Sequence, residues 1–496
     1  MTLVSLLIKL LGVGAVVVVA QYISAYLSSP LKQLPGPFVA KFSNWWRFFN
    51  HYSKTHIETQ QALHKKYGNA VRIGPNTVSL SDPSLIKTIY STRGTFVKDG
   101  HIIQNLFSTR SNEFHAKAIK PVQKLYSFTN AFELEPIMDD NVRALVSELE
   151  SRFVEGANKG KTCDIGEWIS YFAWDFLGDM TLSKRMGFME QAKDVNNLID
   201  TAEKVMRYFS VVGQVPTLDK LLGKNPYLPY KFPDFSHAAG FCVQAFIERA
   251  QNMEQFKGKK DYMNGFLKAK EEYPDLVTDN EVIGYLILNI LGGADTTAIV
   301  SKAIFYHILK HPRVVKILVS ELRSSSLPYP ASYTTTSTLP YLDACIKEGL
   351  RMHPVVGHIF ERVVPSTGLT LSSGVSLPPG TIVGVNPWIL HRNTDVFGDD
   401  AESFRPERWL RGEGEGEGEF EARLKRMKDA DLTFGMGNRT CLGRPLGLVE
   451  IYKLVATLFR RFEIELEDQN AEWELHKQWF VWPHKIMVKL SPVKSG

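Results

Sequence analysis

Ten residues near the C-terminus, Phe434 to Gly443 (FGMGNRTCLG), limit the possible folds of this chain more than any other segment. They present Cys441 from a glycine-rich loop, immediately before an apolar stretch of helical periodicity from Leu446 to Phe462. A helix N-terminus carries partial positive charge and free N–H groups, which favour a thiolate over a thiol. An electron-rich sulfur held in this way is what a haem iron requires to split dioxygen. A buried structural cysteine beside a turn is the alternative, but it does not explain so many fixed positions at fixed spacing.

The composition is that of a globular chain with a large core. Of its 496 residues, 44% are hydrophobic and 22% charged, and the formal net charge of +5 comes without a lysine–arginine run of nucleic-acid type. The cysteines show no Cys-x-x-Cys spacing and no disulfide framework, which fits a reducing cytosolic compartment. They are Cys163, Cys242, Cys345 and Cys441. The sequence also shows no clustered ligands for a structural zinc site.

The first residues predict a membrane anchor. Leu3 to Leu27 is almost entirely apolar, interrupted by Lys9 and Gln21, and is long enough to cross a hydrocarbon layer of roughly 30 Å. The first positive charge after this segment is Lys32, so by the positive-inside rule the short N-terminus faces the lumen and the remainder faces the cytosol. A cleaved signal peptide is the alternative, but the segment lacks a basic n-region and a clear cleavage site.

A stiff proline-rich turn, Leu34-Pro35-Gly36-Pro37, breaks any helix that leaves the membrane. No repeat period and no break in composition follows it. We therefore expect a membrane anchor at residues 1–29, a proline-rich hinge at 30–38 and a single domain at 39–496.

Periodicity beyond the hinge predicts a mainly α domain with small β-sheets. Val71 to Ile73 and Thr77 to Leu80 flank a Gly-Pro-Asn turn and predict a β-hairpin. Thr278 to Glu281 form a capping box that opens a long apolar helix to about Lys310. The Gly-Glu repeat from Arg411 to Phe420 predicts a solvated loop. Two alternating segments predict edge strands, Phe462 to Glu467 and Ile486 to Leu490.

The middle of the long helix carries the run Gly292-Gly293-Ala294-Asp295-Thr296-Thr297. Consecutive glycines weaken a helix by about 1 kcal/mol each relative to alanine, so they need a reason. One reason is room for a flat cofactor and bound dioxygen, and the other is a close crossing with a second helix. In the first case, Asp295 and Thr296 offer a carboxylate and a hydroxyl that can relay protons to oxygen.

These patterns together resemble the cytochrome P-450 family. The run around Cys441 fills every fixed position of the family's haem-binding signature, phenylalanine-x-x-glycine-x-arginine-x-cysteine-x-glycine. The glycine-rich helix resembles the family's oxygen-activating helix, and the anchor and hinge resemble those of microsomal members. Glu348-Gly349-Leu350-Arg351 resembles the Glu-x-x-Arg motif, and Pro406-Glu407-Arg408-Trp409 resembles the Pro-Glu-Arg-Trp segment. The resemblance covers nearly the whole chain from the hinge onward.

The resemblance implies a cytochrome P-450 fold and a haem b cofactor (iron protoporphyrin IX) with the Cys441 thiolate as axial metal ligand. Phe434, Gly437 and Gly443 would shape the cofactor loop. The haem propionates would be bound by Arg439, Arg362 and His391. In the helix where the family has a further propionate arginine, that position is held by Ile119, so His115, Lys117 or Lys120 would substitute.

The resemblance also assigns roles away from the cofactor loop. Asp295 and Thr296 would deliver protons during catalysis. Glu348, Arg351 and Arg408 would form a buried structural network that locks the cysteine loop. A basic face for an acidic flavoprotein reductase would be formed by Lys120, Lys124, Arg444 and Lys453. Apolar segments would line a substrate pocket in which His358 is the one evident polar anchor.

The expected function is that of a membrane-bound haem-thiolate monooxygenase similar to fungal enzymes related to pisatin demethylase. It would oxidise an apolar small molecule with dioxygen and electrons from NADPH through a separate NADPH–cytochrome P-450 reductase, with cytochrome b5 as a further candidate donor. The expected location is the endoplasmic reticulum membrane, with the catalytic domain in the cytosol, and the expected role is secondary metabolite biosynthesis. Alternatives are detoxification by the same chemistry, a haem-thiolate isomerase or dehydratase, and a haem-binding sensor that never turns over.

Overall fold

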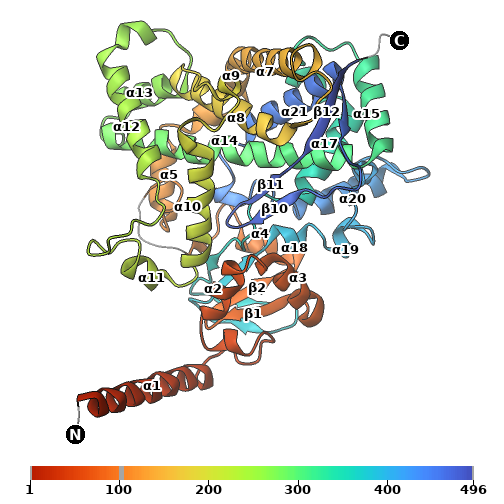
Figure 1. The fold of residues 1–496 in the computed structure, drawn as a ribbon. Helices are drawn as coiled ribbons and strands as arrows, with labels where there is room; N and C mark the ends of the chain where they lie inside the picture. The colour runs from red at the N-terminus through yellow and green to blue at the C-terminus, as the bar shows by residue number, and fades with distance from the viewer. Residues whose placement is uncertain (1–2, 100–104, 494–496) are drawn as a thin grey trace.

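The computed structural model of the protein describes residues 3–99 and 105–493. It is mainly helical with small sheets, as the sequence predicted. Helices make up the upper part of the molecule in Figure 1, and a sheet that contains β1 and β2 lies below them, beside α2 and α3. The longest helix, α14, runs through the middle of the molecule (Figure 1).

The helical body is built on six long helices. They are α7 (Glu135–Leu149), α8 (Ile165–Leu182), α14 (Asp279–Leu309), α15 (Pro312–Ser324), α17 (Pro340–Met352) and α21 (Arg444–Arg461). Around them lie α2 (Trp45–Tyr52), α3 (His56–Tyr67), α4 (Ile86–Ile89), α5 (Asn112–Ile119), α6 (Phe128–Glu133), α9 (Phe188–Gln191), α10 (Leu198–Val212), α11 (Pro216–Leu221), α12 (Ser236–Gln251), α13 (Tyr262–Glu272), α16 (Tyr333–Thr336), α18 (Pro387–Leu390), α19 (Thr394–Phe397) and α20 (Glu417–Asp429).

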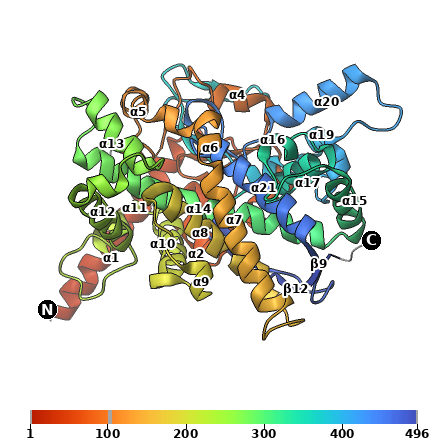
Figure 2. The same cartoon turned by 90° about the horizontal axis from the view of Figure 1, so that it is seen from above.

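Helix α14 begins and ends where the sequence predicted. The Thr278 backbone N–H donates to Glu281 Oε2 over 3.1 Å, which completes the capping box. The helix packs against α8, α17 and α21, and Figure 2 shows α14 beside these elements from above. Its apolar residues are largely buried, so α14 is the central helix of the core.

The largest sheet has the strand order β1-β2-β8-β5-β3. Its strands are β1 (Ala70–Gly74), β2 (Thr77–Leu80), β3 (Val97–Lys98), β5 (Arg362–Val363) and β8 (Ile382–Val385). The β1–β2 pair is the predicted hairpin, and β2 pairs with β8 in parallel. Strands β3 and β5 are antiparallel and place Lys98 opposite Arg362. The sheet therefore brings together two basic residues that are far apart in sequence.

The smaller sheets are formed by strands from the last third of the chain together with β4. Strand β12 (Met487–Pro492) lies between β4 (Cys163–Asp164) and β9 (Phe462–Leu466), so the prediction of two edge strands is wrong for β12. The remaining sheets are hairpins of β10 (Glu474–Lys477) with β11 (Val481–His484) and of β6 (Leu369–Thr370) with β7 (Ser376–Leu377).

The predicted loop at the Gly-Glu repeat is only partly a loop. Helix α20 begins at Glu417, inside the repeat. The Gly416 backbone N–H donates to Glu419 Oε2 over 3.1 Å, and two acidic residues occupy the first turn, where they are favourable to the helix dipole. Arg423, on the next turns, pairs with Glu415 over 2.7 Å. The favourable interaction of these acidic residues with the helix dipole therefore outweighs the loss of helix stability caused by the glycines of the repeat.

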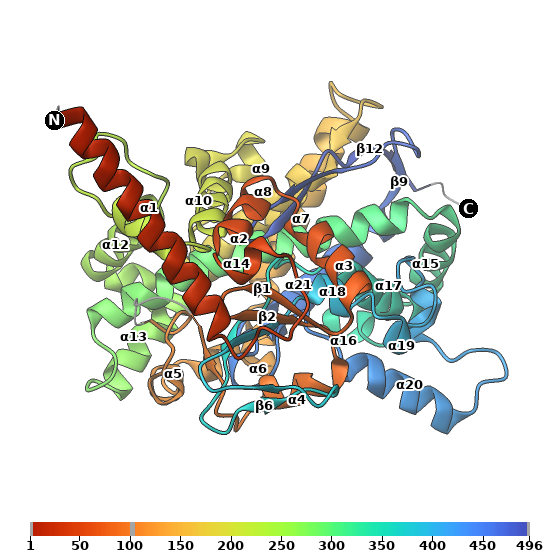
Figure 3. The ribbon, with the colours of Figure 1, turned by 90° about the horizontal axis from the view of Figure 1, so that it is seen from below.

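Helix α1 (Leu3–Leu27) projects away from the sheet end of the molecule (Figure 1), so that it lies in front of the body in the view from below (Figure 3). Among its described side chains, Val16 is 68% exposed and Leu27 is 65% exposed. By length and composition, the described helix that could cross a membrane is α14, but 56% of its most apolar window is buried inside the protein. The anchor at residues 1–29 therefore stays a prediction.

Candidate active site

The loop before α21 holds Cys441 by backbone contacts. The Cys441 N–H donates to the Phe434 carbonyl over 2.8 Å, which closes the loop on itself. Gly437 has φ +73°, and a Cβ there would stand 2.1 Å from the Tyr90 carbonyl oxygen, so only glycine fits. Gly443 is less constrained, because an added Cβ would lie at an ordinary distance of 3.9 Å from Cys441 Sγ.

Solvent reaches the Cys441 residue, but neighbouring atoms surround its sulfur. Its side chain is exposed, whereas the other three cysteines are buried. Burial of the sulfur by surrounding atoms raises the pKa of Cys441, while the backbone N–H groups of Gly443 and Arg444 and the Arg444 charge lower it. The predicted helix N-terminus is present, but in the protein alone its donors do not outweigh desolvation. A cation bound to the sulfur would supply the missing stabilisation of a thiolate.

Four basic side chains lie close together near the cysteine loop. The group comprises Lys98, His115, Arg362 and Arg439, and the charge of at least one other member lowers the pKa of Lys98, of His115 and of Arg439. Burial, followed by the charges of Arg362 and Arg439, lowers the pKa of Lys98 to about 7. Burial, followed by the charges of Arg439 and Lys98, lowers the pKa of His115 to about 4. Among the described residues, none of the four forms an ion pair with a carboxylate.

Arg439 shows most directly that the four basic side chains have no anionic partner among the described residues. One of its nitrogens, Nη2, donates to the Ser111 carbonyl and to Asn112 Oδ1, each over 3.2 Å. Its Nε and Nη1 atoms are buried, and within residues 3–99 and 105–493 they have no hydrogen-bond partner. A buried donor without a partner costs about 1–3 kcal/mol, and more when it is charged. The unpartnered nitrogens of Arg439 are therefore suited to bind an anionic ligand.

The two glycines of α14 have different neighbours. A Cβ at Gly293 would stand 2.7 Å from Leu177 Cδ1, so Gly293 permits the close crossing with α8. A Cβ at Gly292 would meet nothing within 4 Å, so Gly292 borders open space. Thr296 Oγ1 donates to the Gly292 carbonyl over 2.8 Å, which places the hydroxyl on the same side of the helix. The close helix crossing therefore explains Gly293, and the open space at Gly292 is compatible with the room that a cofactor and dioxygen would need.

Asp295 lies on the buried side of α14. It is 5% exposed, and Trp174 Nε1 donates to its Oδ1 over 3.0 Å. Burial raises the pKa of Asp295 to about 7, although the Trp174 hydrogen bond and the Lys302 charge act in the opposite direction. A carboxyl group with this pKa can both donate and accept a proton near neutral pH.

Glu348 is the centre of a buried network of hydrogen bonds. Its carboxylate accepts from Arg351 Nη2 over 2.7 Å, from Arg351 Nε over 2.8 Å and from Arg408 Nε over 3.3 Å. Trp409 Nε1 and the Arg405 backbone N–H also donate to it, each over 2.9 Å. The structure thus brings together all three residues of the predicted network, which are each no more than 2% exposed.

Comparison with known proteins agrees with this geometry. The family model described as cytochrome P-450 matches residues 39–490. The chain belongs to the cytochrome P-450 family. It is 37% identical to the cytochrome P-450 monooxygenase cfoH of Aspergillus candidus over 94% of this chain and 89% of the relative. It is 36% identical to cicH of Emericella nidulans over 93% of each chain, and 34% identical to asR2 of Sarocladium schorii over 98% of this chain and 96% of the relative.

Membership identifies a haem-thiolate enzyme, a monooxygenase whose haem iron is bound by a cysteine. Two observations show that the residues of this P-450 fit the cofactor. The thiol of Cys441 is accessible at the start of α21, and beside it Arg439 has two buried nitrogens for which the described residues provide no partner. Arg439, Arg362 and Lys98 would hold the propionate carboxylates, since guanidinium and ammonium groups are their natural partners.

The structure distinguishes among the substitutes for the missing arginine of α5. His115 is half-buried in the cation group, whereas Lys120 is exposed at the end of the helix. Lys117 is exposed as well and pairs with Glu113 over 2.9 Å. His115 is therefore the better placed residue, although its lowered pKa makes it a neutral hydrogen-bond donor at neutral pH.

His391 has a different role from the one the resemblance implied. Its ring is fully buried, with Nδ1 hydrogen-bonded to the Arg351 carbonyl over 3.1 Å. Its Nε2 accepts from the Leu432 backbone N–H over 3.0 Å. Both ring nitrogens are thus used within the protein, and no N–H remains for a propionate. His391 joins the Glu348 network to the segment before the cysteine loop.

Sequence reasoning missed Lys98. It lies in a strand of only two residues, and its position depends on pairing with Arg362 across more than 260 residues of chain. The guanidinium of Arg362 in turn lies 4.9 Å from the centre of the Tyr90 ring. The only local signal was a lysine within the apolar segment that the sequence assigned to the pocket.

Proposed function

We propose that this P-450 oxidises an apolar small molecule in the secondary metabolism of a fungus, with electrons that NADPH supplies through a separate reductase. The fungal origin of the related monooxygenases supports the setting. The sequence has no flavin or nucleotide-binding motif of its own, which supports a separate electron donor, with cytochrome b5 as a further candidate. Bound haem supplies the activation of dioxygen.

The observation that carries the proposal is the pairing of Asp295 and Thr296 on α14. The Thr296 hydroxyl lies beside the open space at Gly292, where an oxygen ligand has room. The adjacent Asp295 carboxyl is shielded from solvent and has a pKa of about 7. Asp295 can therefore take up protons from the interior of the protein, and Thr296 can orient the final donor toward oxygen. An enzyme that rearranges its substrate without dioxygen would not need this pair.

Reconstitution with a fungal NADPH–cytochrome P-450 reductase tests the proposal. Product formation from apolar metabolites should require NADPH and dioxygen together, and labelled dioxygen should place one labelled atom in the product. Conversion without NADPH would instead indicate an isomerase or dehydratase. Saturable ligand binding without turnover under any of these conditions would indicate a sensor or carrier.

Three of the four residues predicted to form a basic face for the reductase are exposed. Lys120, Lys124 and Arg444 are exposed, as a docking surface for an acidic partner requires. Lys453 does not belong to this surface. It is fully buried and pairs with Glu135 and Asp139, each over 2.7 Å, so its predicted role is wrong.

Substitution of Asp295 by asparagine should remove the pH dependence of coupling. In the wild type, the ratio of product to NADPH consumed should fall as pH rises through about 7, because Asp295 loses its proton there. In Asp295→Asn, which keeps an acceptor for Trp174, this ratio should be low at every pH. Turnover should drop roughly 10²-fold, the lower end of the range for general acid catalysis.

The pH dependence of the free energy of unfolding tests the raised pKa of Asp295 independently of turnover. Because its pKa is raised on folding, the folded state binds the extra proton between about pH 4 and pH 7. The free energy of unfolding of the wild type should therefore fall with rising pH in that window, by up to about 1.4 kcal/mol per pH unit. Asp295→Asn should lack this slope, whereas Asp279→Asn, an exposed change on the same helix, should retain it. Equal slopes in all three proteins would contradict the assignment.

We further propose that residues 1–29 anchor the protein in the endoplasmic reticulum membrane, with the hinge at 30–38 and the catalytic domain at 39–496 on the cytosolic side. The exposed apolar side chains of α1 support this, as do those beside the hinge: Phe38 is 72% exposed and Phe49 is 60% exposed. Apolar side chains gathered in this way are a mark of contact with a membrane or a partner.

Removal of residues 1–29 should convert the protein from an integral to a peripheral or soluble form. In microsomes, the full chain should stay in the pellet after alkaline carbonate and require detergent for release. The shortened chain should be released by carbonate or salt, because the apolar helix that crosses the hydrocarbon layer is missing. Release of the full chain by carbonate alone would contradict the anchor.

A further inference from the structure

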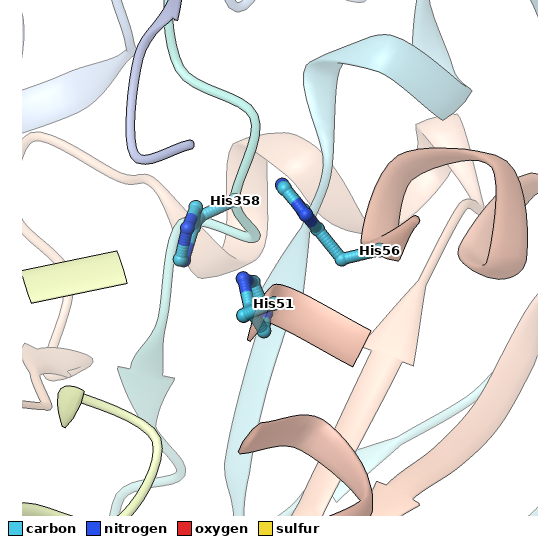
Figure 4. Close-up of side chains that lie close together, drawn as sticks. All are labelled: His51, His56 and His358. Atoms are coloured by element: carbon cyan, nitrogen blue, oxygen red, sulfur yellow. The ribbon is translucent and has the colours of Figure 1, made fainter. Parts of the chain in front are cut away.

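Three histidines from separate parts of the chain converge below the helical body. His51 lies in the last turn of α2, His56 is the first residue of α3, and His358 lies between α17 and β5. They are 5%, 1% and 6% exposed, respectively. Figure 4 shows the three side chains gathered together, and one ring nitrogen of each lies within 4.8 Å of those of the other two. None of the three residues belongs to the cysteine loop or to α14.

His56 forms no hydrogen bond with any of the described residues. Both of its ring nitrogens are buried without a hydrogen bond. The Gln478 carbonyl lies close enough to raise the pKa of His56 slightly, but its geometry is not that of a hydrogen bond. A buried imidazole without partners costs about 1–3 kcal/mol for each unsatisfied group. The protein therefore holds an unsatisfied ligand group beside two further imidazoles.

Ser210 of α10 fixes the other two rings. Its hydroxyl is hydrogen-bonded to His358 Nε2 over 2.9 Å and to His51 Nδ1 over 3.3 Å. The His358 ring also stacks on Trp479, with the ring centres 4.6 Å apart. This position differs from the expectation that His358 is a polar anchor for substrate, because its ring packs within the cluster.

The three imidazoles are neutral at neutral pH, so each carries one nitrogen lone pair, which in His51 and His358 can bind a metal when Ser210 accepts an N–H from the ring. Burial lowers the pKa of His56 to about 4, and burial with mutual repulsion and the Arg47 charge lowers the pKa values of His51 and His358 well below 6.5. Arg47 itself pairs with Glu361 over 2.5 Å. Glu361 thus pairs with Arg47 and not with a histidine, so an ion pair with this carboxylate does not explain why the three histidines lie together. Neutral imidazole nitrogens are instead good ligands for zinc, copper, nickel and iron.

We propose that His51, His56 and His358 bind a Zn²⁺ ion, oriented by the hydroxyl of Ser210. Zinc binds imidazole nitrogens at about 2.0–2.1 Å in tetrahedral geometry, so two nitrogens on one ion lie about 3.3–3.4 Å apart. Binding therefore requires the rings to turn inward from their present spacing. The stacking of His51 on His56, with ring centres 4.2 Å apart and an interplanar angle of 23°, means that one of these two rings turns most.

A zinc ion here would connect elements that are distant in sequence. It would join α2, α3 and the segment before β5, and Ser210 would extend the connection to α10. Two turns earlier, Glu203 on the same helix contacts His476 and His484. Helix α10 therefore makes histidine contacts at Glu203 and at Ser210, and the proposed ion has a structural role.

The first test uses the full-length, haem-loaded enzyme. After treatment with a chelator and dialysis against zinc chloride, metal analysis should find about one zinc per haem iron. Zinc K-edge X-ray absorption, which haem iron does not obscure, should show imidazole ligation with nitrogens at about 2.0–2.1 Å. Failure to retain zinc, or a first coordination sphere made of oxygen, would overturn the proposal without any variant.

Variants then assign the ion to this cluster. His56→Phe keeps a ring of similar size but removes the ligand, and should weaken zinc affinity by more than about 100-fold. Ser210→Ala should weaken it about 10–100-fold, as expected when a hydrogen bond that orients a ligand is lost. His237→Phe, an exposed change on α12, should bind zinc as the wild type does. The haem absorption spectrum reports whether each variant is folded.

The cluster of Glu203, His476 and His484 provides the decisive comparison, because its ligand atoms also lie within 4.8 Å of one another. His476→Phe should leave zinc binding unchanged if the ion occupies the site at His56. Loss of zinc in His476→Phe with retention in His56→Phe would overturn the assignment. Equal affinity in the wild type and His56→Phe would overturn it as well.

Discussion

Replacement of Cys441 by serine should abolish the red-shifted Soret band of the reduced, carbon monoxide-bound protein. Product formation should fall on the order of 10³-fold or more, which corresponds to about 4 kcal/mol in the barrier. A serine hydroxyl could receive the same backbone N–H groups of Gly443 and Arg444. Its oxygen, however, lacks the electron-rich character by which a thiolate assists cleavage of dioxygen. The spectrum and the turnover should be measured at equal haem content.

The matched control is Cys242→Ala, because Cys242 is buried in α12 and remote from the cysteine loop. This variant should keep the thiolate spectrum and the turnover of the wild type. The loop itself should survive Cys441→Ser, since it is closed by the backbone bond to Phe434. A variant that keeps the thiolate-type band after Cys441→Ser would show that another residue binds the iron.

Local sequence was sufficient where the chemistry depends on residues near one another. The loop around Cys441, the helix that contains Asp295 and the turn of helix from Glu348 to Arg351 are each short segments whose backbone fixes the side chains. The capping box of α14 and the β1–β2 hairpin were predictable for the same reason. In each case, a pattern of a few residues determines both the element and the residue it presents.

Sequence alone failed where position depends on tertiary pairing. Lys98 joins the cation group only because β3 pairs with β5, and no local pattern encodes that pairing. The sequence of His391 and its neighbours does not show that both of its ring nitrogens are hydrogen-bonded to backbone groups. The sequence likewise predicted no structural zinc site, because the three ligands of the proposed site are separated by up to about 300 residues of chain.

Replacement of Glu348 by glutamine should lower the free energy of unfolding by about 3–5 kcal/mol, the cost of leaving buried charges without their partner. The change keeps the size of the side chain but removes the charge that faces Arg351 and Arg408. It also places an amide N–H₂ group where the carboxylate now accepts from guanidinium groups. Denaturant unfolding should be measured at a fixed and saturating haem content, because haem binding itself stabilises the folded state.

Glu402→Gln is the matched control, since it makes the same change at a carboxylate that is exposed to solvent. The Glu402 side chain is 76% exposed and pairs with Arg392 over 2.9 Å. Exposed pairs of this kind contribute about 0–1 kcal/mol, so the control should change stability little. The contrast arises from burial, because water can replace the lost partner at Glu402 but cannot reach Arg351 and Arg408. A change below about 1 kcal/mol in Glu348→Gln would mean that backbone carbonyls satisfy both arginines without the carboxylate.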